Sequence, residues 1–173
     1  RVVTVMGQAM PKPGLRPFLP ADAPIFAAIY EASIAELTGE DYTEAQQEAW
    51  IAAIDESDFA ARLGGQLTLI ATLRETPVGF ASLKGKDHID LLYVHPSAVG
   101  QGVASSLCDA LEKLAGARGA SKLTADVSDT AHHFFTRRGY VAQQRNTVPL
   151  GDEWLGNTTM QKTLGDTPKG ASQ

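Results

Sequence analysis

The sequence predicts a single α+β domain of mixed α/β character, in which a central, mostly antiparallel sheet of about seven strands is flanked by helices. Short turns at 75–77 and 85–87 separate neighbouring stretches of alternating residues, which favours antiparallel strand pairs. Other stretches repeat apolar residues at helical spacing. The chain has 173 residues, 43% of them apolar, which is enough for one continuous core.

The N-terminal part is predicted to form one strand and two helical regions. Residues 15–18 form a short strand, and the Ala-rich stretch 22–37 forms a helix because its apolar residues recur on roughly one face. The second helical region covers 43–54, where Thr43 suits the N-cap because a glutamine follows three residues later. This region resumes over 57–63 and ends at a pair of glycines.

The rest of the chain is predicted to alternate between strands and helices. Residues 88–94 are apolar on both faces, as expected in the middle of a sheet, and Pro96 must end this strand because proline cannot donate to the ladder. Apolar residues spaced by three or four positions over 103–114 predict an amphipathic helix, which Gly116 helps to terminate. The predicted series after the second helical region is strands 66–73, 78–84 and 88–94, a helix from 103, strand 122–127, helix 129–138, and strands 140–148 and 154–162. The order is therefore strand, two helices, three strands, helix, strand, helix and two strands.

Composition and charge exclude several kinds of partner. The formal net charge is -5 and the longest basic cluster is the pair Arg137 and Arg138, so we expect no nucleic-acid partner. The apolar start, 1–6, is too short and too soon interrupted to span a membrane, so we expect no membrane partner. The sole cysteine, Cys108, fits a reducing compartment, and we expect a cytoplasmic protein. The four histidines lack metal-ligand spacing, so we expect no metal.

One segment carries a chemical signal. The predicted strand 88–94 runs through Pro96 into a loop with Gly100 and Gly102, and that loop opens the helix. Glycines let backbone N–H groups approach a ligand, and a helix N-terminus adds partial positive charge, so the turn suits a pyrophosphate, although ordinary turns also use glycine pairs. A P-loop is a poor fit because no lysine lies between Val94 and Leu107, and the dinucleotide fingerprint is a poor fit because Ser105 stands where its third glycine belongs.

This segment resembles the GNAT acetyltransferase superfamily, whose hallmark is a strand ending in Val-x-Pro, then a Gln/Arg-x-x-Gly-x-Gly/Ala loop and a helix. Val94-His95-Pro96 matches the first part, and the loop 99–104 matches the second except that Val99 replaces Gln or Arg. Leu15-Arg16-Pro17 is similar to the family's opening strand, and 128–140 is similar to its late helix. The resemblance therefore implies a GNAT-like fold and an acetyltransferase domain at 15–163, with 1–14 as an N-terminal extension and 164–173 as a flexible C-terminal tail.

The resemblance also implies which residues bind the cofactor, acetyl-CoA. The loop and helix start would hold the pyrophosphate, and a bulged central strand near 92–94 would offer backbone N–H groups if its neighbour diverges. Ser128 and Phe135 stand where the family often has an Asn and a Tyr, and Phe135 has no proton to give. The expected cofactor-binding residues are Leu92, Tyr93, Val94, Gly100, Gln101, Gly102, Val103, Ala104, Ser105, Ser128 and Phe135.

Three residues are candidates for proton transfer. Asp90, early in the central strand, is the candidate base acting through water, and it also fits a solvated strand end. Tyr93 and Tyr140 are candidate proton donors, and both also fit simple packing. Five acidic residues of the N-terminal helical region fit either a face that attracts a cationic amine or an ordinary solvated surface. They are Glu31, Glu36, Glu40, Asp41 and Glu44.

The resemblance implies an acetyl-CoA-dependent N-acetyltransferase that acts on an amine of a small molecule or peptide, as a bacterial protein, monomeric or homodimeric. A non-catalytic acyl-CoA-binding or sensing module is the alternative, which Val99 and Phe135 favour. A third possibility is transfer from another acyl-CoA, because pocket volume beside Leu92 cannot be derived from sequence.

Overall fold

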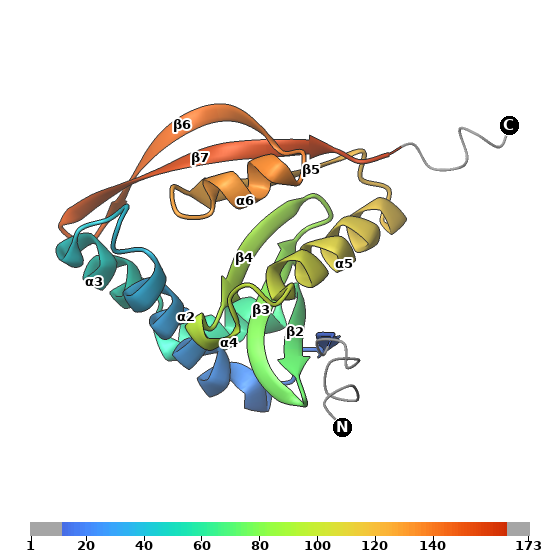
Figure 1. Cartoon of the computed structure of the whole chain (residues 1–173), viewed down its shortest axis with the longest axis horizontal. Helices are drawn as coiled ribbons and strands as arrows, with labels where there is room; N and C mark the ends of the chain where they lie inside the picture. Colours follow the sequence, from blue (N-terminus) through green and yellow to red (C-terminus); the bar gives the residue numbers. More distant parts are fainter. Residues whose placement is uncertain (1–11, 166–173) are drawn as a thin grey trace, which may run out of the picture.

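The computed structural model describes residues 12–165, which form one seven-stranded sheet in the order β1-β2-β3-β4-β5-β7-β6 (Figure 1). The strands are β1 (Gly14–Pro17), β2 (Leu67–Leu73), β3 (Thr76–Lys84), β4 (His88–Val94), β5 (Lys122–Ser128), β6 (Val141–Leu150) and β7 (Glu153–Thr163). All neighbouring strands are antiparallel except β4 and β5, which are parallel. The predicted fold class and element order are confirmed.

The helices form two layers on the sheet. They are η1 (Pro20–Asp22), α2 (Ala23–Leu37), α3 (Glu44–Ala52), α4 (Glu56–Gly64), η2 (Pro96–Ala98), α5 (Val103–Ala117) and α6 (His132–Arg137). One core contains the apolar face of α5 and Phe135 of α6, and the other contains Phe26 of α2, Leu63 of α4 and Phe80 of β3. Helices α5 and α6 thus cover one face of the sheet, and α2 and α4 cover the other (Figure 1).

The helix starts follow local capping chemistry. The amide of Gln46 donates to Thr43 Oγ1 at 3.1 Å and the amide of Thr43 donates to Gln46 Oε1 at 2.8 Å, which confirms the predicted capping box of α3. Helix α6 is shorter than the predicted 129–138. Its start moves to His132 because the amide of Ala131 donates to Ser128 Oγ at 3.1 Å, which holds 128–131 as a turn.

The sheet opens between β4 and β5. Within the described residues these strands pair only at His88 with Thr124 and Ile89 with Ala125, after which β4 continues along β3 and β5 continues along β7. A bulge lies at the same point, because Ser82 faces Leu91 and Leu83 faces Ile89, which leaves Asp90 as the extra residue. We expected the bulge at 92–94, and that position was wrong: it lies at Asp90. The inner edges of β4 and β5 beyond it keep backbone groups that no strand pairs.

The described chain continues past the end of β7. Leu164 packs on the core of the α5 face, and its amide donates to the carbonyl oxygen of Ser121 at 2.9 Å. Leu164, the first residue of the predicted tail, is therefore packed against the domain, while residues 1–11 of the predicted extension and 166–173 of the tail lie outside the described residues. No helix in the described part is long and apolar enough to cross a membrane.

Candidate active site

A cavity of about 490 Å³ lies where β4 and β5 diverge. It is lined from the α5 side by the start of that helix and by α6, and from the opposite side by the C-terminal half of α2 and by Trp50 of α3. The cavity therefore extends to both faces of the sheet. Of the predicted cofactor residues, all except Gln101 line it: Leu92, Tyr93, Val94, Gly100, Gly102, Val103, Ala104, Ser105, Ser128 and Phe135.

The loop before α5 leaves main-chain N–H groups without a partner inside the helix. Gly100 and Gly102 have φ values of 84° and 81°, which residues with a side chain rarely adopt. A Cβ atom added at either position would meet no other atom within 4 Å. Glycine is therefore needed here for its backbone conformation and not for space. Gly102 is the N-cap of α5 and provides no side-chain cap, and the first intrahelical bond within the described chain is from Ser106 N to Gly102 O at 3.0 Å. The N–H groups of 103–105 are left for a ligand.

Two side chains of this loop do not act as the family pattern implies. Gln101 Nε2 donates to the carbonyl oxygen of Ser97 at 3.3 Å, so this side chain braces the loop outside the cavity. Val99 lines the cavity but is 54% exposed and offers no polar group. Binding at this end therefore depends on main-chain donors.

Tyr93 lies on the α2 side of the central strand inside an aromatic cluster. Trp50 Nε1 donates to the Tyr93 hydroxyl at 3.3 Å, and the Tyr30 hydroxyl donates to the carbonyl oxygen of Trp50 at 2.6 Å. Burial raises the pKa of Tyr93 to about 12. Its oxygen already accepts a hydrogen bond and its phenol stays protonated at neutral pH, so Tyr93 presents a donor to the cavity.

Asp90 lines the cavity but has both oxygens occupied. Arg62 donates from Nε to Oδ2 at 2.7 Å and from Nη2 to Oδ1 at 3.0 Å, and Gln66 Nε2 donates to Oδ2 at 2.8 Å. Burial alone would raise the pKa of Asp90, but hydrogen bonds from Arg62 and Gln66 and the charge of Arg62 together lower it. This carboxylate is a poor proton acceptor, so the arrangement argues against the predicted role of base and indicates that Asp90 anchors the bulge to α4.

Tyr140 lies away from the cavity. It is 2% exposed, its hydroxyl donates to Glu112 Oε2 at 2.9 Å, and it is not among the lining residues. Burial raises the pKa of Tyr140, and the Glu112 carboxylate adds to that effect. The predicted role as proton donor therefore has no support in this geometry, and Tyr140 packs edge-on against Phe135, with ring centroids 4.9 Å apart.

Ser128 and Phe135 line the cavity near the end of β5. The Ser128 hydroxyl oxygen accepts from the amide of Ala131, which fixes the turn into α6, while Phe135 is 3% exposed and presents an apolar wall. A phenylalanine at this position shapes the cavity and moves no proton.

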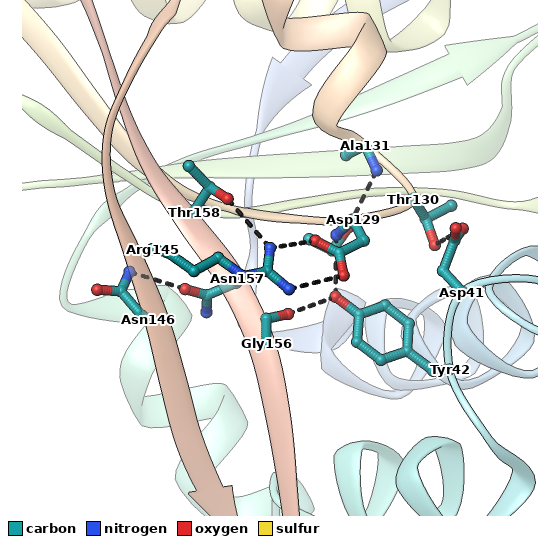
Figure 2. A network of polar contacts seen from close by, with 11 residues as sticks. Asp41, Tyr42, Asp129, Thr130, Ala131, Arg145, Asn146, Gly156, Asn157 and Thr158 are labelled. Atoms are coloured by element: carbon teal, nitrogen blue, oxygen red, sulfur yellow. Dashed lines mark hydrogen bonds and ion pairs between the residues drawn. The ribbon is translucent and has the colours of Figure 1, made fainter.

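A polar network adjoins the cavity at Thr130 and Ala131, which line it (Figure 2). The Tyr42 hydroxyl donates to the carbonyl oxygen of Gly156 at 2.6 Å and accepts from the amide of Asp129 at 2.9 Å. Arg145 Nη2 donates to Asp129 Oδ2 at 3.0 Å, and this hydrogen bond helps to lower the pKa of Asp129. The segment before α3, the β5–α6 turn and the β6–β7 hairpin are thereby joined.

The acidic residues lining the cavity differ from those expected. None of the five candidates from the N-terminal helical region lines the cavity, and Asp41 instead accepts from the Thr130 hydroxyl at 2.8 Å. Asp126 of β5 lines it, and the sequence reasoning missed this residue. The available signal was the alternation in β5, where Asp126 stands between the buried residues Ala125 and Val127. In the described residues no group of three or more His, Cys, Asp or Glu is placed to hold a metal ion.

Comparisons with known proteins agree with this fold. The family model of the acetyltransferase (GNAT) domain matches residues 38–164. The uncharacterized N-acetyltransferase YafP of Escherichia coli (strain K12) is 33% identical over 147 residues, which cover 85% of this chain and 93% of that protein. The crystal structure of a GCN5-related N-acetyltransferase from Rhodopseudomonas palustris is 66% identical, with a TM-score of 0.88 over 91% of this chain and 99% of that chain.

More distant structures share the fold alone. The structure of yncA from Salmonella typhimurium with its cofactor acetyl-CoA has a TM-score of 0.66 at 19% identity, over 90% of this chain and 95% of that chain. The PaiA N-acetyltransferase of Thermoplasma acidophilum, solved with coenzyme A, has a TM-score of 0.73 at 16% identity, over 88% of this chain and 99% of that chain. From the family model and the relatives above 30% identity, this chain belongs to the GNAT family of N-acetyltransferases.

Proposed function

We propose that this enzyme transfers the acetyl group of acetyl-CoA directly to an amine of a small molecule or a peptide. The observation that carries the proposal is the position of the gap between β4 and β5, which begins at the bulge and ends at the free N-terminus of α5. One continuous cavity thus joins an anion site to a strand edge with unpaired backbone groups.

The pyrophosphate of the cofactor is assigned to the start of α5. The N–H groups of 103–105 and the positive end of the helix dipole suit two phosphate charges, and the left-handed glycines give the chain a close approach. The pantetheine arm then follows the inner edge of β4 from Val94 toward Asp90, where it replaces the missing neighbour strand. That path covers about 13 Å at the usual rise per strand residue.

The thioester is assigned to the bulge end of the gap. The amine nitrogen attacks the thioester carbon, negative charge develops on the carbonyl oxygen, and the C–S bond then breaks to leave the coenzyme thiolate. Backbone N–H groups of β4 beyond Asp90 are candidates to stabilise the oxygen, since β5 no longer pairs with this edge. Tyr93 stays protonated, because its pKa is raised to about 12, and its hydroxyl proton is assigned to the acceptor side.

The proton of the acceptor must leave before attack. An alkyl amine with a pKa of about 10.4 is neutral in roughly one molecule per thousand at neutral pH, which costs about 4 kcal/mol. Asp90 is held by Arg62 and Gln66 and is not assigned this task. This first proton is released to water. The second proton leaves the nitrogen after attack, as the tetrahedral intermediate collapses to the amide, and it protonates the departing thiolate.

The test is release of free coenzyme A thiol from acetyl-CoA across a panel of amines, with binding of acetyl-CoA measured by calorimetry. Amine-dependent turnover supports the proposal. Saturable binding without turnover on any amine would support the non-catalytic acyl-CoA module, which the absence of a proton donor at Phe135 favours. Testing propionyl-CoA and longer thioesters in the same assay would decide whether another acyl group is preferred.

A further inference from the structure

We infer that Asp126 receives the ammonium group of the acceptor, so that the enzyme selects aliphatic amines that are cationic at neutral pH. The inference rests on the proposed transfer to an amine and adds the recognising residue and the charge class of the substrate.

Asp126 stands at the closed end of the gap. It is the first β5 residue past the last β4–β5 pair, Ile89 with Ala125, and therefore faces the bulge at Asp90 across the opening. Its neighbours Ala125 and Val127 are buried in the core of the α5 face. Because strand side chains alternate, Asp126 points to the opposite face, where Trp50 lines the cavity.

A chain of hydrogen bonds orients this carboxylate. The Thr159 hydroxyl donates to Asp126 Oδ1 at 2.6 Å. The Thr159 oxygen in turn accepts from Asn146 Nδ2 at 2.8 Å, and Asn146 Nδ2 also donates to Asn157 Oδ1 at 2.9 Å. The single hydroxyl proton of Thr159 is thus committed to Asp126, which positions one carboxylate oxygen and leaves the other for a ligand.

The charge of Asp126 is not compensated. Asp90 and Asp126 are the only charged residues lining the cavity in residues 12–165, and Asp90 is paired with Arg62. Within the same part of the chain Asp126 forms no ion pair, and its hydrogen-bond partner is a neutral hydroxyl. The lining therefore carries one unpaired negative charge and no positive one on the acceptor side. Asp126 is itself exposed, and a carboxylate with no cation beside it attracts a cationic ligand.

The experiment compares two amines of similar shape but different charge, cyclohexylamine, which is cationic at pH 7, and aniline, which is neutral. Calorimetry measures binding of each to the protein saturated with coenzyme A, and thiol release measures turnover. The wild-type protein should bind cyclohexylamine at least about tenfold more tightly than aniline. Asp126→Asn keeps the acceptor for Thr159 and removes the charge, so it should abolish this preference while leaving affinity for acetyl-CoA unchanged.

Glu75→Gln is the matched control, since it removes one charge from the exposed β2–β3 turn outside the cavity and should change nothing. A cyclohexylamine preference that survives Asp126→Asn, or a wild-type protein that binds neither amine, would overturn the inference. If cyclohexylamine binds through Asp126 but no amine is acetylated, the result contradicts the proposed acetyl transfer and still supports Asp126 as the binding site of the ammonium group. In Asp126→Asn, a raised KM for cyclohexylamine with unchanged kcat would show that Asp126 positions the amine, because a residue needed only for folding would not change KM alone.

Discussion

The two ends of the cavity differ in the groups that they offer to a ligand. The end assigned to the cofactor offers main-chain groups, namely the N–H groups of 103–105, next to two glycines with positive φ angles. The end assigned to the acceptor consists of side chains from distant elements, such as Asp126 of β5, which is joined to Thr159 of β7. Main-chain recognition needs a short stretch of sequence, whereas a wall of side chains needs the whole fold. Main-chain recognition can therefore be predicted from a sequence motif, whereas the side-chain wall cannot.

The largest expected effect comes from a charge placed at the main-chain end. Ala104→Glu puts a carboxylate in the first turn of α5, where the diphosphate is assigned, so affinity for acetyl-CoA should fall by about 100-fold by calorimetry. The same change should not lower thermal stability, because an acidic residue suits a helix N-terminus. Ala104→Gln is the control of equal size and should lose less than about tenfold. Equal losses of acetyl-CoA affinity in both variants would mean that the diphosphate does not bind near residue 104.

A smaller effect should follow from backbone conformation. Gly102→Ala and Gly119→Ala both place a side chain at a positive φ, 81° and 90°, with nothing within 4 Å of the new Cβ. Each should destabilise the protein by about 1 kcal/mol in thermal or denaturant unfolding. Only Gly102→Ala should weaken binding of acetyl-CoA, by about tenfold, since Gly119 lies past the other end of α5. Matching losses of affinity would contradict the assignment of the anion site.

Asp90→Asn tests whether the bulge carboxylate is structural. It should lower the free energy of unfolding by about 1 to 3 kcal/mol at pH 7, because Arg62 loses its charged partner. The folded-state pKa of Asp90 is lowered, so its contribution is present at neutral pH and lost as the pH falls through that pKa. The difference between the two proteins should therefore shrink in acid. A large loss of kcat with unchanged stability would restore Asp90 as the base.

The smallest expected effect on substrate binding comes from the polar network around Tyr42. Tyr42→Phe removes the hydroxyl that joins Gly156 to Asp129, which should cost about 1 to 2 kcal/mol of stability and raise the KM of the amine a few-fold, with acetyl-CoA affinity unchanged. Tyr140→Phe is the matched control, a buried hydroxyl lost outside the cavity. It should cost similar stability with no change in KM. If Tyr140→Phe instead lowers kcat, Tyr140 has the proton-donor role that its position argues against.

The contrast between the two ends also explains what sequence alone could predict. The order of strands and helices follows from local periodicity, and the loop before α5 follows from its glycines. Both could therefore be predicted from the sequence. The bulge at Asp90 depends on the register with β3, which no local pattern encodes. Asp126 becomes a cavity residue only because β4 leaves β5 at Ile89. Its partner Thr159 is supplied by β7, the strand next to β5 in the sheet.

Amide hydrogen exchange with and without acetyl-CoA tests the central claim most directly, because it reports on the main-chain donors themselves. The account predicts slower exchange confined to 92–94 and 103–105, with β1 and β2 unchanged. Saturating acetyl-CoA that leaves both segments exchanging at their free rates, or that protects other segments in their place, would contradict it.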